Sequence, residues 1–267
     1  MGFTGHIGGL FALMTASVVL SMGFNWRYAF IFGAFVAVIG VFSRLKLRET
    51  PEFLNYKLRI AKKAGGNNQK PQMVKNTSFD DEKINKKTIL AFALTEFHNP
   101  IGFYIAIVYL SGFMKNSLGM TLAQVATHNL KVLVFSFIGI LIVIYLVKRM
   151  HPVKIAMAVV LLFVIGLPFI PYWLDIIVSI GNSEALFSLF CIQSLILLLA
   201  QPAYGTLDAI QYKYFPINKR FTTVATTSGI ASTLPRVLII FSLIPLTHYF
   251  GYYALWFIFT PAVVGYL

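Results

Sequence analysis

Long runs of apolar residues occupy most of this chain, and charged residues are nearly absent from them. Charged residues make up 12% of the 267, whereas a soluble domain has about 25%. A soluble protein of this length has no means of covering so much apolar surface, so we expect a polytopic membrane protein. The runs are continuous rather than alternating in polarity, which favours transmembrane helices over the strands of a barrel.

Eight runs are candidates for transmembrane helices. They are residues 7–23, 28–43, 88–113, 126–147, 155–174, 185–207, 221–246 and 251–267. A helix needs about 20 residues to cross the hydrocarbon core. The second run is shorter, but Arg27 and Arg44 at its ends can extend toward the headgroups. The predicted fold class is therefore all-α, a bundle of about eight spans.

One long polar segment, residues 44–87, divides the chain. It holds 12 of the 22 Lys and Arg residues. Thr50 and Pro51 are typical of a helix start, and we expect a short amphipathic helix on the membrane surface, followed by a flexible linker. The expected division is residues 1–45, with two helices, residues 46–87, the basic linker, and residues 88–267, with six helices.

The distribution of positive charge predicts the orientation in the membrane. If the basic linker is cytoplasmic, the cytoplasmic loops hold 18 Lys and Arg residues, and the opposite side holds Arg27, Lys115 and Lys131. This bias is the positive-inside pattern, so we expect a multi-pass protein of the cell (inner) membrane with a cytoplasmic 44–87 loop. The same pattern accounts for the net charge of +13 without a nucleic-acid partner, and the linker would contact anionic lipid.

Residues that support metal or catalytic chemistry are scarce. The single Cys191 lies in an apolar run, and the five histidines have no ligand spacing. No glycine-rich phosphate loop and no Ser/His/Asp arrangement at a helix end occurs. We therefore predict no metal site, no cofactor and no enzymatic activity.

Two neighbouring segments carry a family resemblance. Residues 25–33 read Asn-Trp-Arg-Tyr-Ala-Phe-Ile-Phe-Gly, and residues 44–53 read Arg-Leu-Lys-Leu-Arg-Glu-Thr-Pro-Glu-Phe. They resemble the end of helix 5, helix 6 and the start of the central loop in the major facilitator superfamily. The closest branch is the metabolite–proton symporters that include proline/betaine transporters. Further along, residues 99–117 are similar to helix 7, residues 215–220 to the loop between helices 10 and 11, and residues 222–234 to helix 11.

The resemblance implies a partial major facilitator fold with the equivalents of helices 5 to 12. Residues 1–45 would be the last two helices of the N-terminal half, and residues 88–267 the six-helix C-terminal half. Twelve helices are expected of the family, so we expect either a truncated chain or a partner chain that supplies the first four. The implied function is proton-coupled symport of a small organic solute, either a proline/betaine-like osmolyte or a carboxylate. The alternative is a non-transporting remnant or an interaction subunit.

Two arginines stand where the family has gating loops. Residues 148–154 occupy the place of an Asp-Arg-x-Gly-Arg-Arg type loop between helices 8 and 9, and they lack its Asp and Gly. Arg149 in this segment and Arg220 in the loop between helices 10 and 11 are the expected gating residues.

Glu96 and Arg236 are the charges that fall well inside apolar runs, where an ionisable residue is costly and is by default a functional hypothesis. Glu96 shares a helical face with Asn99, Pro100 and Phe103. It is a candidate proton carrier or, alternatively, an acid at the cytoplasmic interface, and Asn99 is a candidate substrate contact. Arg236 would bind a substrate carboxylate or pair with an acid elsewhere in the bundle.

Other polar side chains are candidates for the wall of a substrate cavity. Ser194, Gln201 and Asp208 repeat every seven residues, with Tyr204 beside them. They either line a cavity or form hydrogen bonds between helices. Tyr104 and Tyr109 would hold a quaternary ammonium by cation–π contact or serve in packing. The substrate-binding residues predicted from these patterns are Arg236, Tyr104, Gln201, Tyr204 and Asn99.

Overall fold

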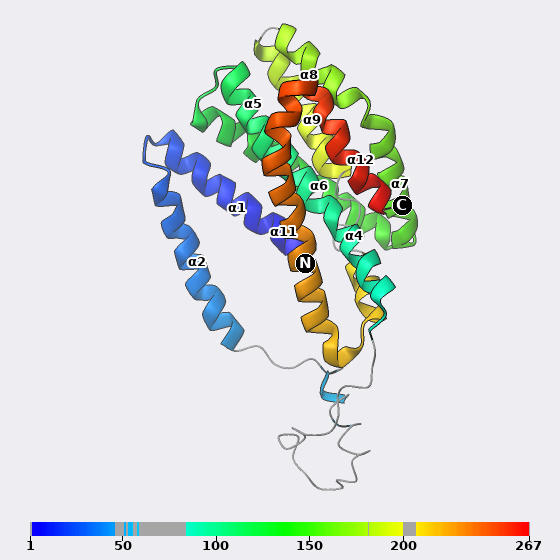
Figure 1. Ribbon diagram of the computed structural model, residues 1–267. Coiled ribbons are helices and arrows are strands. Elements are labelled where there is room, and N and C mark those ends of the chain that lie inside the picture. Colours follow the sequence, from blue (N-terminus) through cyan, green and yellow to red (C-terminus); the bar gives the residue numbers. More distant parts are fainter. Residues whose placement is uncertain are drawn as a thin grey trace.

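The computed structural model describes residues 2–45, 51, 53–55, 58, 84–180, 182–199 and 207–266. Within these ranges the regular structure is entirely helical, without strands. The helices pack side by side, and the long helix α11 (Ile217–Phe250) runs along the bundle from one end to the other (Figure 1). The prediction of an all-α helical bundle is confirmed.

The remaining elements follow in chain order. They are α1 (Gly2–Ser21), α2 (Arg27–Leu45), α4 (Lys86–Phe103), the π-helix η2 (Tyr104–Tyr109), α5 (Leu110–Ser117), α6 (Leu122–Val147), α7 (Pro152–Gly166), α8 (Phe169–Ser179), α9 (Asn182–Leu199), α10 (Asp208–Gln211), the 3-10 turns η3 (Tyr212–Tyr214) and η4 (Gly251–Tyr253), and α12 (Ala254–Tyr266).

Helix ends are set by local side-chain chemistry. The Thr121 hydroxyl accepts a hydrogen bond from the backbone N–H of Gln124, whose side chain in turn accepts from the backbone N–H of Thr121. This capping box satisfies two amide groups that have no partner within the helix, and it starts α6. Helix α11 ends at Phe250, directly before Gly251. The φ of Gly251 is +57°, a conformation that residues with a Cβ rarely adopt.

The helix that begins at Lys86 changes its hydrogen-bond pattern on the way through the bundle. It passes Pro100, which has no backbone N–H to donate, and becomes π-helical at Tyr104. The α-helical pattern resumes at Leu110. Such π segments are rare and occur frequently at functional sites, because the wider turn re-aims the groups around it.

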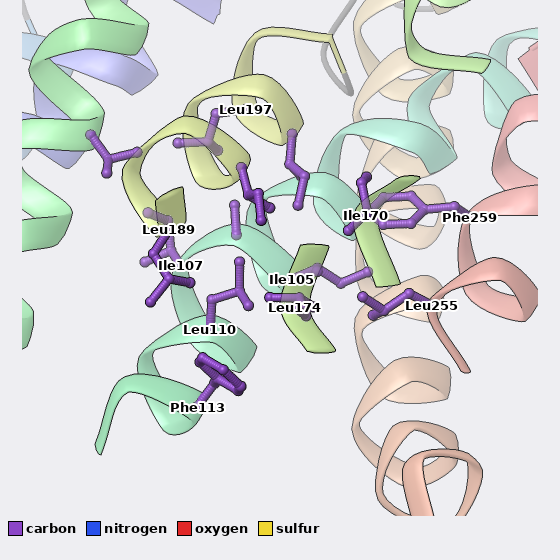
Figure 2. Close-up of a cluster of buried hydrophobic side chains, with 14 of the residues drawn as sticks. Ile105, Ile107, Leu110, Phe113, Ile170, Leu174, Leu189, Leu197, Leu255 and Phe259 are labelled. Atoms are coloured by element: carbon purple, nitrogen blue, oxygen red, sulfur yellow. The ribbon is translucent and has the colours of Figure 1, made fainter. Parts of the chain in front are cut away.

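The hydrophobic core forms around this π segment. Figure 2 shows Ile105, Ile107 and Leu110 facing side chains from α8, α9 and α12. Ile105 and Leu110 have no exposed surface. Around this core α4 packs on α11 and α12, α6 packs on α9, and α1 packs on α6. These described helices therefore share one core or pack directly on it, and α1 joins them through its contact with α6.

The outside of the bundle is rich in large apolar side chains. On α2, Phe30, Phe35 and Leu45 are 68%, 67% and 77% exposed. This helix packs against α1 and leans away from the body of the bundle (Figure 1). The outer face of α11 is apolar as well, with Phe241 and Ile244 largely exposed. This distribution is what a bundle surrounded by lipid presents, since water would oppose it.

Each of the eight apolar runs overlaps helical structure, but the number of spans is not confirmed. Among the described residues, two helical stretches are long and apolar enough to cross a membrane, Leu122–Val147 and Lys219–Gly265. A third is obtained if Pro152–Gly166 and Phe169–Ser179, which bend by 50° at their junction, count as one span. Breaks such as this bend and the π segment shorten the uninterrupted helices. The prediction of about eight spans therefore stays a prediction.

The basic linker lies mostly outside the described residues. Of the expected amphipathic helix, the structure describes Pro51, residues 53–55 and Leu58, and these are helical.

Candidate functional site

A network of buried polar side chains crosses the core between α6, α9 and the π segment. Gln193 on α9 has no exposed surface. Its amide nitrogen donates to the carbonyl oxygen of Ala106 at 2.7 Å and to Oδ1 of Asn129 at 3.1 Å. Its Oε1 lies 2.8 Å from Nε2 of His128. The Asn129 amide donates in turn to the Ser111 hydroxyl at 2.7 Å.

The network determines the tautomer of His128. The Ala106 carbonyl can only accept, so the amide nitrogen of Gln193 must face it, and Oε1, which can only accept, faces His128. The contact of 2.8 Å therefore requires a proton on Nε2 of His128, and in the neutral ring Nδ1 is then a hydrogen-bond acceptor. The tautomer of His128 is thus assigned from the hydrogen bonds of its partner Gln193.

His128 also reaches a cavity of about 580 Å3 beside the connection between α5 and α6. The cavity is lined by Leu118, Gly119, Met120, Ala123, Gln124, Thr127, His128, Lys131 and Leu186. Its volume is in the range of ligand pockets, about 300–1,000 Å3. The Thr127 hydroxyl donates to the carbonyl oxygen of Ala123 at 2.8 Å and lies 3.0 Å from the Ser17 hydroxyl of α1. The buried network therefore has one end at a space that can hold a small molecule.

A second polar cluster lies where α4 packs on α11. The hydroxyl of Ser228 donates to Oε2 of Glu96 at 3.1 Å, and both residues are half-buried. At the adjacent residue of α4, the amide of Gln211 donates to the Thr95 hydroxyl at 3.0 Å. Glu96 thus faces a neighbouring helix of the bundle, and its carboxylate has a hydroxyl partner there.

The other predicted site residues are spread over the bundle. Arg236 follows Pro235 on α11 and is exposed, about two turns beyond Ser228. Tyr104 begins the π segment and packs against the hydrophobic core, half-buried. The backbone of Asn99 belongs to α4, but its side chain lies outside the described structure. Gln201 and Tyr204 fall outside the described residues.

The two expected gating residues have local partners. Arg149 lies just after α6, with its guanidinium carbon 5.4 Å from the centre of the Tyr145 ring. Nε of Arg220 donates to the carbonyl oxygen of Phe215 at 3.2 Å and so braces the turn that leads into α11. Their role as gates stays a prediction.

The buried network escaped sequence reasoning. The predicted polar stripe on α9 starts from Ser194, which is 4% exposed and has no hydrogen-bond partner in the described part of the chain. Its neighbour Gln193 instead makes the contacts. A signal existed, because Asn129 and Ser136 lie seven residues apart in an apolar run and therefore share one helical face. The faces that meet across helices are decided by packing, so Gln193 could not be assigned to the same site.

Comparisons of the chain with protein-family models, with curated proteins and with solved structures find no match.

Proposed function

We propose that this protein is a membrane transport protein that carries a small organic solute together with a proton. The observation that carries the proposal is the Glu96 carboxylate held between α4 and α11 by the Ser228 hydroxyl. An acid among apolar helices is costly and serves proton or ion pathways in transporters. The Ser228 hydroxyl holds the carboxylate at the packing surface between the two helices, where a carboxylate can take up and release a proton.

The apolar exterior supports a place in the membrane. Large apolar side chains are exposed on α2, α7 and α11, and the polar side chains that form hydrogen bonds face one another inside. Such an arrangement is favourable in lipid and unfavourable in water. We propose that the protein is a multi-pass protein of the cell (inner) membrane, with the 44–87 loop on the cytoplasmic side.

The finer proposal is a partial major facilitator fold of the metabolite–proton symporter type. In this proposal residues 1–45 belong to one half of the transporter and residues 88–267 form the other. Solute would bind near Arg236 and Tyr104, and movement of the halves against each other would alternate access. The support is the sequence resemblance together with the all-helical architecture of the described residues.

The test is uptake into vesicles that contain purified 1–267. Labelled proline, betaine and a dicarboxylate are offered under an inward proton gradient, with and without a protonophore. We expect saturable uptake of one of them that the protonophore abolishes. The Glu96→Gln variant should reduce this uptake by roughly tenfold or more, because the amide cannot carry a proton.

The matched control is Glu184→Gln, which neutralises an exposed acid in the first turn of α9. It should transport like the unchanged protein. Full proton-dependent uptake by Glu96→Gln would overturn the proposed role of Glu96.

A second candidate function is an interaction subunit, and the exposure of α2 favours it. This helix presents apolar side chains such as Phe30 and Phe35 over most of its length, although it packs on α1. A partner chain with further transmembrane helices would cover this surface. Vesicles with 1–267 alone would then show no uptake, and uptake would appear when such a partner is reconstituted with it.

A further inference from the structure

We propose that the cavity beside the α5–α6 connection binds a small hydroxycarboxylate, whose carboxylate meets Lys131 and whose hydroxyl donates to His128. The site is separate from Glu96 and Ser228, because it is built by α6, by the connection that precedes it and by the start of α9. The inference therefore goes beyond the proposed transport function.

The charge of the lining selects an anion. Among the described residues that line the cavity, Lys131 is the charged one and no acid is present. Gln124, His128 and Lys131 follow one another at intervals of four and three residues, so they lie along one face of α6. Lys131 and Gln124 are exposed and His128 is buried, so the cavity is open to solvent at the ammonium group. An ammonium group beside amide and imidazole groups favours a carboxylate over a cation.

The hydrogen-bonding capacity of the lining adds a second requirement. Oε1 of Gln124 already accepts from the backbone N–H of Thr121 at 2.8 Å, so the amide nitrogen of Gln124 remains as a donor. The Thr127 hydroxyl donates to Ala123. In the neutral tautomer that Gln193 imposes, His128 keeps Nδ1 as an acceptor. The cavity thus combines donors for a carboxylate with one acceptor for a ligand hydroxyl.

The apolar wall of the cavity adds a third condition. Leu118, Met120 and Leu186 line the cavity together with its polar groups. A space of about 580 Å3 accommodates a short carbon chain between these side chains and the polar face of α6. A small hydroxy acid such as lactate satisfies all three conditions: one negative charge, one hydroxyl donor and a short apolar body.

The experiment measures binding to purified full-length chain in a neutral detergent by titration calorimetry. The probes are lactate, propionate, which lacks the hydroxyl, and tetramethylammonium, which has the opposite charge. We expect saturable binding of lactate, weaker binding of propionate and none of tetramethylammonium. Lys131→Gln should weaken lactate binding about tenfold, as expected for the loss of one close charge pair in a partly solvated site.

Three further variants distinguish binding inside the cavity from attraction of the anion to any exposed lysine. Lys115→Gln removes an exposed lysine in the last turn of α5 that does not line the cavity, and it should bind lactate normally. Lys131→Arg keeps the charge and should keep the binding. Ala123→Leu fills the cavity and should abolish binding although Lys131 is present.

The result that overturns the proposal is an absence of saturable lactate binding, an equal loss in the Lys115 and Lys131 variants, or full binding by Ala123→Leu. Propionate binding as tight as that of lactate would overturn the role of His128 as acceptor. Because binding is measured without transport, failure of this site and failure of proton-coupled uptake are separate results.

Discussion

Gln193 shows how much depends on one polar side chain in an apolar bundle. Its amide contacts Ala106, Asn129 and His128, which belong to two other parts of the fold. A buried polar group without a partner costs about 1–3 kcal/mol, whereas a satisfied hydrogen bond between membrane helices contributes only about 0.6 kcal/mol on average. The network therefore determines the position of α9 more than it adds to stability, because a misplaced α9 would leave several buried groups without hydrogen-bond partners.

We expect Gln193→Leu to destabilise the protein by about 2 kcal/mol, because the leucine has a similar size but leaves the Ala106 carbonyl and the Asn129 amide oxygen without this donor. Thermal unfolding in detergent, followed by circular dichroism, should show a midpoint lowered by about 5 °C. Ser188→Ala on the same helix, with a half-buried hydroxyl, is the control and should change the midpoint little. Equal midpoints for Gln193→Leu and the unchanged protein would contradict a structural role of the network.

Helices α6 and α9 approach each other closely at one glycine of α6. At Gly139 on α6, an added Cβ would collide with Cδ2 of Leu198 on α9. Small residues at such points let helix backbones come close in lipid, where the hydrophobic effect does not drive helices together. The contact joins α6 and α9, the two helices whose side chains Asn129, His128 and Gln193 form hydrogen bonds. It therefore helps to align these side chains with one another.

Gly139→Ala should lower stability by about 1–3 kcal/mol relative to Gly112→Ala, because Leu198 has to leave its position. At Gly112 on α5 an added Cβ meets nothing within 4 Å, and the alanine should gain about 1 kcal/mol from its higher helix propensity. Thermal unfolding of both variants checks the difference. In a Leu198→Ala background the penalty at Gly139 should disappear, and its persistence there would show that another contact is responsible.

The bundle as a unit has two features that support a membrane setting, an apolar exterior and a polar interior. The outer faces of α2, α7 and α11 are apolar, while His128, Asn129 and Gln193 are buried. The opposite distribution is usual in water-soluble proteins. The proposed orientation places the connection after α5 and the turn after α6 on opposite sides of the bilayer.

Single-cysteine variants test this orientation. In a Cys191→Ser background, Lys115→Cys and Lys148→Cys are each exposed and lie beyond opposite ends of α6. A membrane-impermeant maleimide added to sealed, inside-out vesicles should label position 148 and spare position 115, and right-side-out vesicles should give the reverse. Labelling of both positions from one side would mean that α6 does not cross the membrane.

The distribution of apolar residues along the chain was sufficient to predict the class of fold. Uninterrupted apolar runs such as residues 126–147 can satisfy their backbone groups in lipid only as helices, so the all-α prediction needed no knowledge of packing. The helix that carries Glu96 and the place of Arg236 in α11 followed in the same way. Composition is a property of each segment alone, and so is its tendency to form a helix.

The tertiary structure was needed wherever two segments had to meet. The partners of Gln193 lie 64 to 87 residues away in the chain. Polar side chains are few in each helix, and one helix offers several faces for them. Packing buries the face of each helix whose donors and acceptors find partners on the neighbouring helices. The same packing places His128 both in the hydrogen-bond network and at the wall of the cavity.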